Sequence, residues 1–176
     1  MHEVLEGPEA REEWPLTLPV TVTLAILAVF VALVTLLGHR AHTEELLLQT
    51  RATDQWALFQ AKNIRLHEMQ SVADMFATFT VVDKDKAATL RESYLQQTNR
   101  YAKEKDEAGQ EAKKLEVERD LVARRADRFD AGEVFLEIGL IICSLTLLTR
   151  RKSFWFSGIA VGAVGLLVAL TGFLLR

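Results

Sequence analysis

Two glutamates are the residues of this sequence best placed to do chemistry. Glu133 and Glu137 are four residues apart, so a helix would carry both on one face. They lie at the start of an otherwise uncharged run that is long enough to cross a membrane. A carboxylate at membrane depth is a candidate site for an ion or a proton. The alternative is that Glu137 snorkels to the membrane interface or forms a structural ion pair with His39, Arg40 or Arg176, and we expect the pairing.

Other kinds of chemistry find little support in the residue pattern. His39 and His42 are three apart, but no third metal ligand accompanies them at a usual spacing. Cys143 is the single cysteine, so no disulfide can form within the chain. The sequence shows no nucleophile–base pair, phosphate-binding loop or carboxylate dyad. We therefore expect no catalytic residue, no bound metal and no cofactor, and thus no enzyme.

Three apolar runs must hold these residues in place. Residues 16–37 and 154–175 are 22 residues long and carry no charge, and residues 131–149 carry few. About 20 helical residues cross a hydrocarbon core of roughly 30 Å. A bilayer offers no water to satisfy backbone amides, so each run is predicted to be a transmembrane helix. Trp14 and Trp155 lie at the edges of the first and third runs, where their rings favour the membrane interface.

The ends and the loops bear on topology and on partners. Residues 1–15 form an acidic leader with five glutamates and one arginine, unlike the basic start of a signal peptide. Residues 150–153 make a short basic loop, which favours the cytoplasm and conflicts with the acidic leader. Following the leader, we expect the segment between the first two runs to be cytoplasmic. A net charge of −3 gives no reason to expect nucleic acid as a partner.

The segment 38–130 is predicted to form a long antiparallel helical hairpin exposed to water. It is rich in Glu, Lys, Gln and Ala, with no proline and only two glycines, which favours helices. The run from Thr80 to Lys86 is the strongest interruption and is the expected turn. After it, residues spaced alternately four and three apart form a stripe along one helix face, as in a coiled-coil seam. The eleven seam positions are Tyr94, Thr98, Tyr101, Lys105, Ala108, Ala112, Leu115, Arg119, Val122, Ala126 and Phe129.

Two further stripes are candidate interaction surfaces. In the third apolar run, small residues recur in steps of four and three at Gly158, Gly162, Gly165, Ala169 and Gly172. Small residues in one line let a second helix approach closely, either within one chain or between copies. In the charged segment, a polar stripe comprises Thr53, Trp56, Gln60, Asn63 and His67. The stripe is either a partner-binding face or a hydrated seam of the hairpin.

The charged segment also resembles a known family. Asp54-Gln55-Trp56, followed by Gln60-Ala61-Lys62, resembles a segment of a bacterial family of uncharacterised membrane proteins with a domain of unknown function. The resemblance extends along most of the chain. It implies a bacterial origin and a multi-pass location in the inner membrane. It implies no activity, substrate or catalytic residue.

Together these patterns predict an all-α membrane protein with three transmembrane helices and a coiled-coil-like hairpin between the first and the second. The expected function is that of a membrane-anchored helical scaffold or interaction protein. We expect it to form homo-oligomers in the lipid bilayer and to bind a protein partner at the hairpin. The alternative is an ion- or proton-conducting oligomer built around Glu137.

Overall fold

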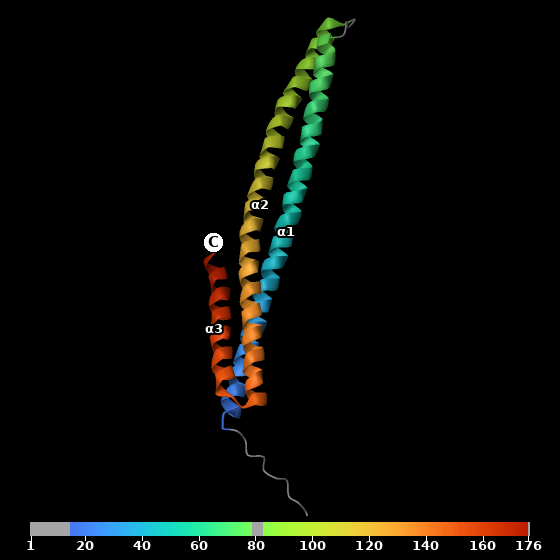
Figure 1. Cartoon of the computed structure of the whole chain (residues 1–176). Helices are drawn as coiled ribbons and strands as arrows, with labels where there is room; N and C mark the ends of the chain where they lie inside the picture. The colour runs from blue at the N-terminus through green and yellow to red at the C-terminus, as the bar shows by residue number, and fades with distance from the viewer. Residues whose placement is uncertain (1–14, 79–82, 176) are drawn as a thin grey trace, which may run out of the picture. The chain divides into compact units, whose positions relative to one another are not determined.

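The computed structural model describes residues 15–78 and 83–175, and these form three helices without a strand (Figure 1). Helix α1 spans Thr17–Thr78, α2 spans Lys84–Thr149 and α3 spans Lys152–Leu174. Each contains a stretch long and apolar enough to cross a membrane. The expected all-helical, three-helix class is confirmed. The acidic leader, Trp14, Thr80–Val82 of the expected turn, and Arg176 lie outside the described residues.

The boundaries between the apolar runs and the charged segment fall inside helices. α1 is 62 residues long and continues through residue 37, and α2 is 66 residues long and continues through residue 130. All three prolines of the chain lie at or before Pro19, within the first turn of α1, where proline is tolerated. Asp83 caps the N-terminus of α2: its carboxylate accepts a hydrogen bond from the Lys86 amide at 3.0 Å.

The described chain forms two compact units. The first, here called the three-helix unit, consists of residues 15–40 and 124–175, and the second, the two-helix unit, of residues 41–123 apart from 79–82. In the three-helix unit, α1 buries Val20, Leu27 and Val34, one residue in every seven. The Trp155 indole N–H of α3 donates a hydrogen bond to the Thr23 hydroxyl of α1 at 3.1 Å. α1 and α3 therefore touch as well as packing on α2.

In the two-helix unit, residues of α1 contact α2 in antiparallel order. The Phe76 and Tyr94 rings stack with centroids 6.0 Å apart, near the connection between the helices. Farther from this connection, the Trp56 indole donates a hydrogen bond to Glu116 and the Arg119 guanidinium donates one to Gln49. These pairs are 60 and 70 residues apart in sequence. All eleven seam positions are buried or half-buried. Alanines at 52, 73, 108, 112 and 126 are among the buried residues of the two helices.

The connection between α2 and α3 consists of Arg150 and Arg151 alone. Arg150 has a φ of 52°, in the left-handed region that residues other than glycine rarely adopt. Its amide donates to the Thr146 carbonyl at 2.8 Å, which closes the last turn of α2. Arg151 returns to an extended conformation with φ −101° and ψ 118°. Two residues are enough to reverse the chain because the first takes this strained conformation.

Candidate functional site

The five small residues of α3 face α2, except that the side-chain position of Gly162 points at Leu27 of α1. Gly158, Gly162, Gly165, Ala169 and Gly172 are the buried residues of α3. A methyl group added at Gly165 would lie 2.7 Å from the Gly132 carbonyl oxygen and 2.8 Å from the Leu136 amide nitrogen. One added at Gly139 would lie 2.8 Å from the Gly158 carbonyl oxygen. The close approach therefore occurs within one chain, and it uses Gly132 and Gly139 of α2, which the sequence analysis did not identify. Their spacing of seven residues was the available signal.

Glu133 is held by α1. The Thr35 hydroxyl donates a hydrogen bond to the Glu133 carboxylate at 2.6 Å, and it also lies 2.9 Å from the Val31 carbonyl. The Glu133 side chain is half-buried. Of the two glutamates, Glu133 is thus the one with a hydrogen-bond partner among the described residues.

Glu137 differs from Glu133 in its exposure and in its partners. It is exposed, and no hydrogen bond or ion pair joins it to another residue within 15–78 or 83–175. The expected pair with His39 or Arg40 is absent, and Arg176 lies outside the described residues. Gly38 lies beside Asp130 and Arg40 is two residues farther along the antiparallel helix α1, so Arg40 is about 13 Å away from Glu137 along α2 by helix rise alone. The spacing in sequence could not show this separation.

The height of Glu137 follows from the glycine contacts. Gly139 approaches Gly158 and Gly162, while Gly132 approaches Gly165 and Ala169. Glu137 lies between Gly132 and Gly139 on α2, so it is level with about Gly162. Gly162 is near the midpoint of α3, which spans Lys152–Leu174. The unpaired carboxylate therefore lies beside the middle of the apolar helix α3 rather than at its end.

Arg125 is a further residue whose role the sequence did not reveal. Its guanidinium Nη2 donates to the Leu175 carbonyl at 3.1 Å, at the C-terminal end of α3. A guanidinium at this position donates a hydrogen bond to a terminal carbonyl of α3 and interacts favourably with the negative end of the helix dipole. Phe129, one turn farther along α2, packs on Phe173 with ring centroids 5.4 Å apart. Together these contacts fix the last turn of α3 against α2.

In the two-helix unit, the predicted polar stripe divides into two parts. Trp56 and Asn63 are half-buried, whereas Thr53, Gln60 and His67 are exposed. The Trp56 indole donates to the Glu116 carboxylate at 2.9 Å, and its ring meets Phe59 edge to face at 5.4 Å. Trp56 therefore belongs to the contact with α2, and the three exposed residues belong to the outer side of α1.

That outer side forms a continuous exposed line without a charged residue. It lies opposite the buried residues Leu48, Ala52, Leu66 and Ala73 of α1, because 100° of rotation separates successive helical residues. We call it the outer face of α1; it comprises Leu46, Thr50, Thr53, Ala57, Gln60, Ile64, His67 and Ser71, all exposed. Leu46 and Ile64 leave 67% and 59% of their surface uncovered. The exposed side of α2, in contrast, carries Lys103, Asp106, Glu107, Lys113, Lys114 and Glu118.

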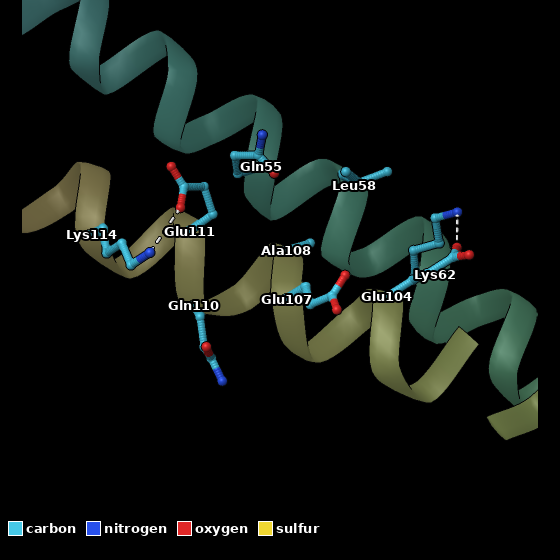
Figure 2. A pocket seen from close by; sticks show the side chains of 9 residues that line it. All are labelled: Gln55, Leu58, Lys62, Glu104, Glu107, Ala108, Gln110, Glu111 and Lys114. Carbon is cyan, nitrogen blue, oxygen red and sulfur yellow. Dashed lines mark hydrogen bonds and ion pairs between the residues drawn. The ribbon is translucent and has the colours of Figure 1, made fainter. Parts of the chain in front are cut away.

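An open groove of about 590 Å³ lies between α1 and α2 in the two-helix unit and is lined by nine residues (Figure 2). Figure 2 shows Lys62 of α1 reaching Glu104 of α2, while Lys114 and Glu111 pair along α2. The Lys62 ammonium and the Arg100 guanidinium donate to Glu104 at 2.5 and 2.6 Å. These hydrogen bonds, that of Lys62 first, hold the pKa of the Glu104 carboxyl below its usual range. The groove's charges are thus largely engaged with one another, and within residues 15–78 and 83–175 no three His, Cys, Asp or Glu side chains gather as metal ligands.

Comparison with known proteins assigns the chain to one family. It matches the family described as a domain of unknown function, DUF4337, over residues 16–175. The chain belongs to the DUF4337 family. No curated protein and no solved structure matches it. The resemblance to an uncharacterised family is confirmed, and the match covers all three helices.

The glycine contacts predict unequal effects of the same small substitution. In Gly165→Ala, the new methyl group meets the Gly132 and Leu136 backbone, so α2 and α3 must separate. We expect a loss of about 1–3 kcal/mol in stability, as for overpacking elsewhere. In Gly162→Ala, the nearest atom is Cδ2 of Leu27 at 2.8 Å, which can move by a change of rotamer. Thermal unfolding in detergent should show a clear loss only for Gly165→Ala, with the exposed Leu167→Phe as a neutral control. Equal melting temperatures for the two alanine variants would contradict the packing.

The lowered pKa of Glu104 predicts how its contribution depends on pH. A carboxylate with a depressed pKa in the folded state stabilises above the unfolded pKa, about 4.3 for glutamate. This contribution is lost as the pH falls through the lower folded-state pKa. We expect Glu104→Gln to melt below the wild type at pH 7, with the difference vanishing in acid. Glu107, whose contact with Lys103 is 3.8 Å long and exposed, provides the control Glu107→Gln, with little difference at any pH.

Proposed function

We propose that this member of the DUF4337 family is a membrane-anchored helical scaffold. In this proposal the three-helix unit crosses the bacterial inner membrane, and the two-helix unit stands in water as an antiparallel hairpin. The exposed surface of the three-helix unit supports the first part. Leu148 and Leu174 each leave 81% of their surface uncovered, and Val29 leaves 60%. Large apolar side chains exposed on all three helices of one unit are what a lipid environment accommodates and water does not.

A multi-pass topology follows from the same proposal. Three crossings place the basic connection Arg150-Arg151-Lys152 on the side opposite the two-helix unit. The positive-inside rule favours this connection in the cytoplasm, whereas the acidic leader crosses a membrane readily. We place the two-helix unit in the cytoplasm, on the acidic leader.

The outer face of α1 is the observation that carries the scaffold function. The glycine stripe and the seam, the two surfaces that first pointed to assembly, are both occupied within one chain. Within residues 15–78 and 83–175, the outer face of α1 has no such partner, and Leu46 and Ile64 are exposed on it. A line of uncharged residues with heptad spacing is the surface that another amphipathic helix can cover. We therefore infer that the two-helix unit binds a helical segment of another polypeptide through this face.

Photo-crosslinking in native membranes tests the scaffold function. A benzophenone amino acid is placed at Ile64 on the outer face of α1, or at the exposed Glu107 of α2 as a control. We expect illumination to give a discrete adduct, heavier than the chain itself, at Ile64 and not at Glu107. The variant Thr53→Lys, which adds a charge to the face, should remove the adduct. Adducts of the same kind at both positions, or none at Ile64, would count against the proposal.

A second candidate is an ion- or proton-conducting assembly, which the exposed position of Glu137 favours. Several copies around an axis would turn Glu137 into an acidic ring of the kind found in cation channels. The neighbouring residues favour a dry interior instead. Thr146 is fully buried on the inner side of α2, and Ile141 and Leu148 share the exposed side with Glu137.

Flux measurements separate the two functions. For purified protein in liposomes we expect no cation or proton flux above that of empty liposomes. The comparison variant is Glu137→Gln, which keeps the shape of the side chain and removes its charge. Flux in the wild type that disappears in Glu137→Gln would replace the scaffold by a conducting assembly.

A further inference from the structure

One side of α2 in the three-helix unit carries an ordered set of exposed residues that the contacts within the chain do not use. Val134, Glu137, Ile141, Ser144 and Leu148 follow one another in steps of three and four, and all five are exposed. We call them the outer face of α2. The apolar members are seven residues apart, and so are the two polar ones, Glu137 and Ser144. The opposite side of the helix is buried, with Leu136, Cys143 and Thr146 at 0% exposure.

Within residues 15–78 and 83–175, no hydrogen bond or ion pair compensates the Glu137 carboxyl. Glu137 is level with about Gly162, near the midpoint of α3, and Arg40 lies about 13 Å away along the helix axis. The nearest hydroxyl on the same face is already engaged, because Ser144 Oγ donates to the Ile141 carbonyl at 2.7 Å. In the bilayer of the proposed function, an exposed carboxyl at this height is costly, and a second chain that covers it can supply the hydrogen bond that the described residues do not.

We propose that a second copy of the chain covers the outer face of α2, so that the two Glu137 carboxyls meet and share one proton. This inference rests on the membrane location in the proposed function. Copies inserted in the same orientation have parallel α2 helices, and a two-fold axis along the membrane normal then places each residue of the face opposite itself. Val134, Ile141 and Leu148 meet their own copies as apolar layers, and Ser144 leaves room between them.

Carboxyl chemistry favours a second copy over an unrelated partner. A residue that meets itself must be able to donate and to accept, and a carboxyl does both once one member of the pair is protonated. A carboxylic acid O–H of one Glu137 donates to a carboxylate oxygen of the other, and the proton comes from water during assembly. Lysine or arginine at this position could only donate and would repel its copy. The single ionisable residue of the outer face of α2 is of the self-complementary kind.

Disulfide trapping tests the geometry in the full-length chain in liposomes. Ser144→Cys places a thiol on the proposed axis, and oxidation should give a covalent dimer. The native Cys143 is fully buried, so the wild type serves as the background and should give none. Val29→Cys on α1 and Leu167→Cys on α3, both exposed, should cross-link much less than Ser144→Cys. Equal cross-linking at the three positions, or none at Ser144, would overturn the proposal.

Substitution of Glu137 in the Ser144→Cys background tests the carboxyl pair. Glu137→Gln keeps a group that both donates and accepts, so cross-linking should persist. Glu137→Leu removes the hydrogen bond and should lower the association constant by roughly 3- to 15-fold, the range for hydrogen bonds between membrane helices. Undiminished cross-linking in Glu137→Leu would show that the carboxyls do not hold the pair.

Two further measurements keep this inference distinct from the proposed function. The mass of the wild type in nanodiscs should be that of a dimer, and a monomer or a larger ring would overturn the two-fold pair. Alkaline extraction of membranes shows whether the chain is embedded. A chain released by alkali contradicts the proposed function and this inference together. An embedded chain without the Ser144 cross-link contradicts this inference alone.

Discussion

The close approach of the α2 and α3 backbones is the constraint on which the three-helix unit depends. Gly132 and Gly139 on one helix and Gly158 and Gly165 on the other leave no room for a methyl group between them. Because a helix has only one side to offer to such a contact, the contact also fixes which residues of α2 face away. Glu137 turns outward for this reason, while Glu133, one turn earlier, stays within reach of Thr35. The direction in which each glutamate side chain faces is thus determined by the glycine contacts rather than by the interactions of the glutamate itself.

A different balance holds the two-helix unit together. Its seam contains long polar side chains, and each reaches a partner with its charged end. The Lys105 ammonium lies 5.8 Å from the Phe59 ring centroid and 3.5 Å from Asp106. The Lys62 ammonium, paired with Glu104, lies 5.4 Å from the Tyr101 ring. Such contacts cover aromatic surface with alkyl chains while the charges stay hydrated. Small buried alanines at 52, 73, 108 and 112 allow the two helices to approach.

Much of this architecture could be predicted from the sequence, because it depends on local patterns. Uncharged runs indicate the membrane-length stretches, and steps of four and three place Gly158 to Gly172 on one side of a helix. The choice of partner could not be predicted in the same way. Glu133 and Glu137 are equivalent as a pattern, and only the height and rotation of α2 against α1 separate them. Trp56 illustrates the same point: it belongs to a polar stripe by spacing, yet its indole binds Glu116, 60 residues away. Contacts between residues so far apart in sequence depend on how the helices pair, and the residue pattern of a single helix does not determine that pairing.

The two-residue connection at Arg150 and Arg151 bears on how the protein is made. With only two residues between them, α2 and α3 cannot occupy distant places during synthesis. In the proposed topology, the second and third spans would leave the insertion machinery side by side as a preassembled pair. The first span, separated from these two by the long charged segment, would already be in the bilayer when they insert. A lengthened connection would thus alter the order of assembly before it altered the finished fold.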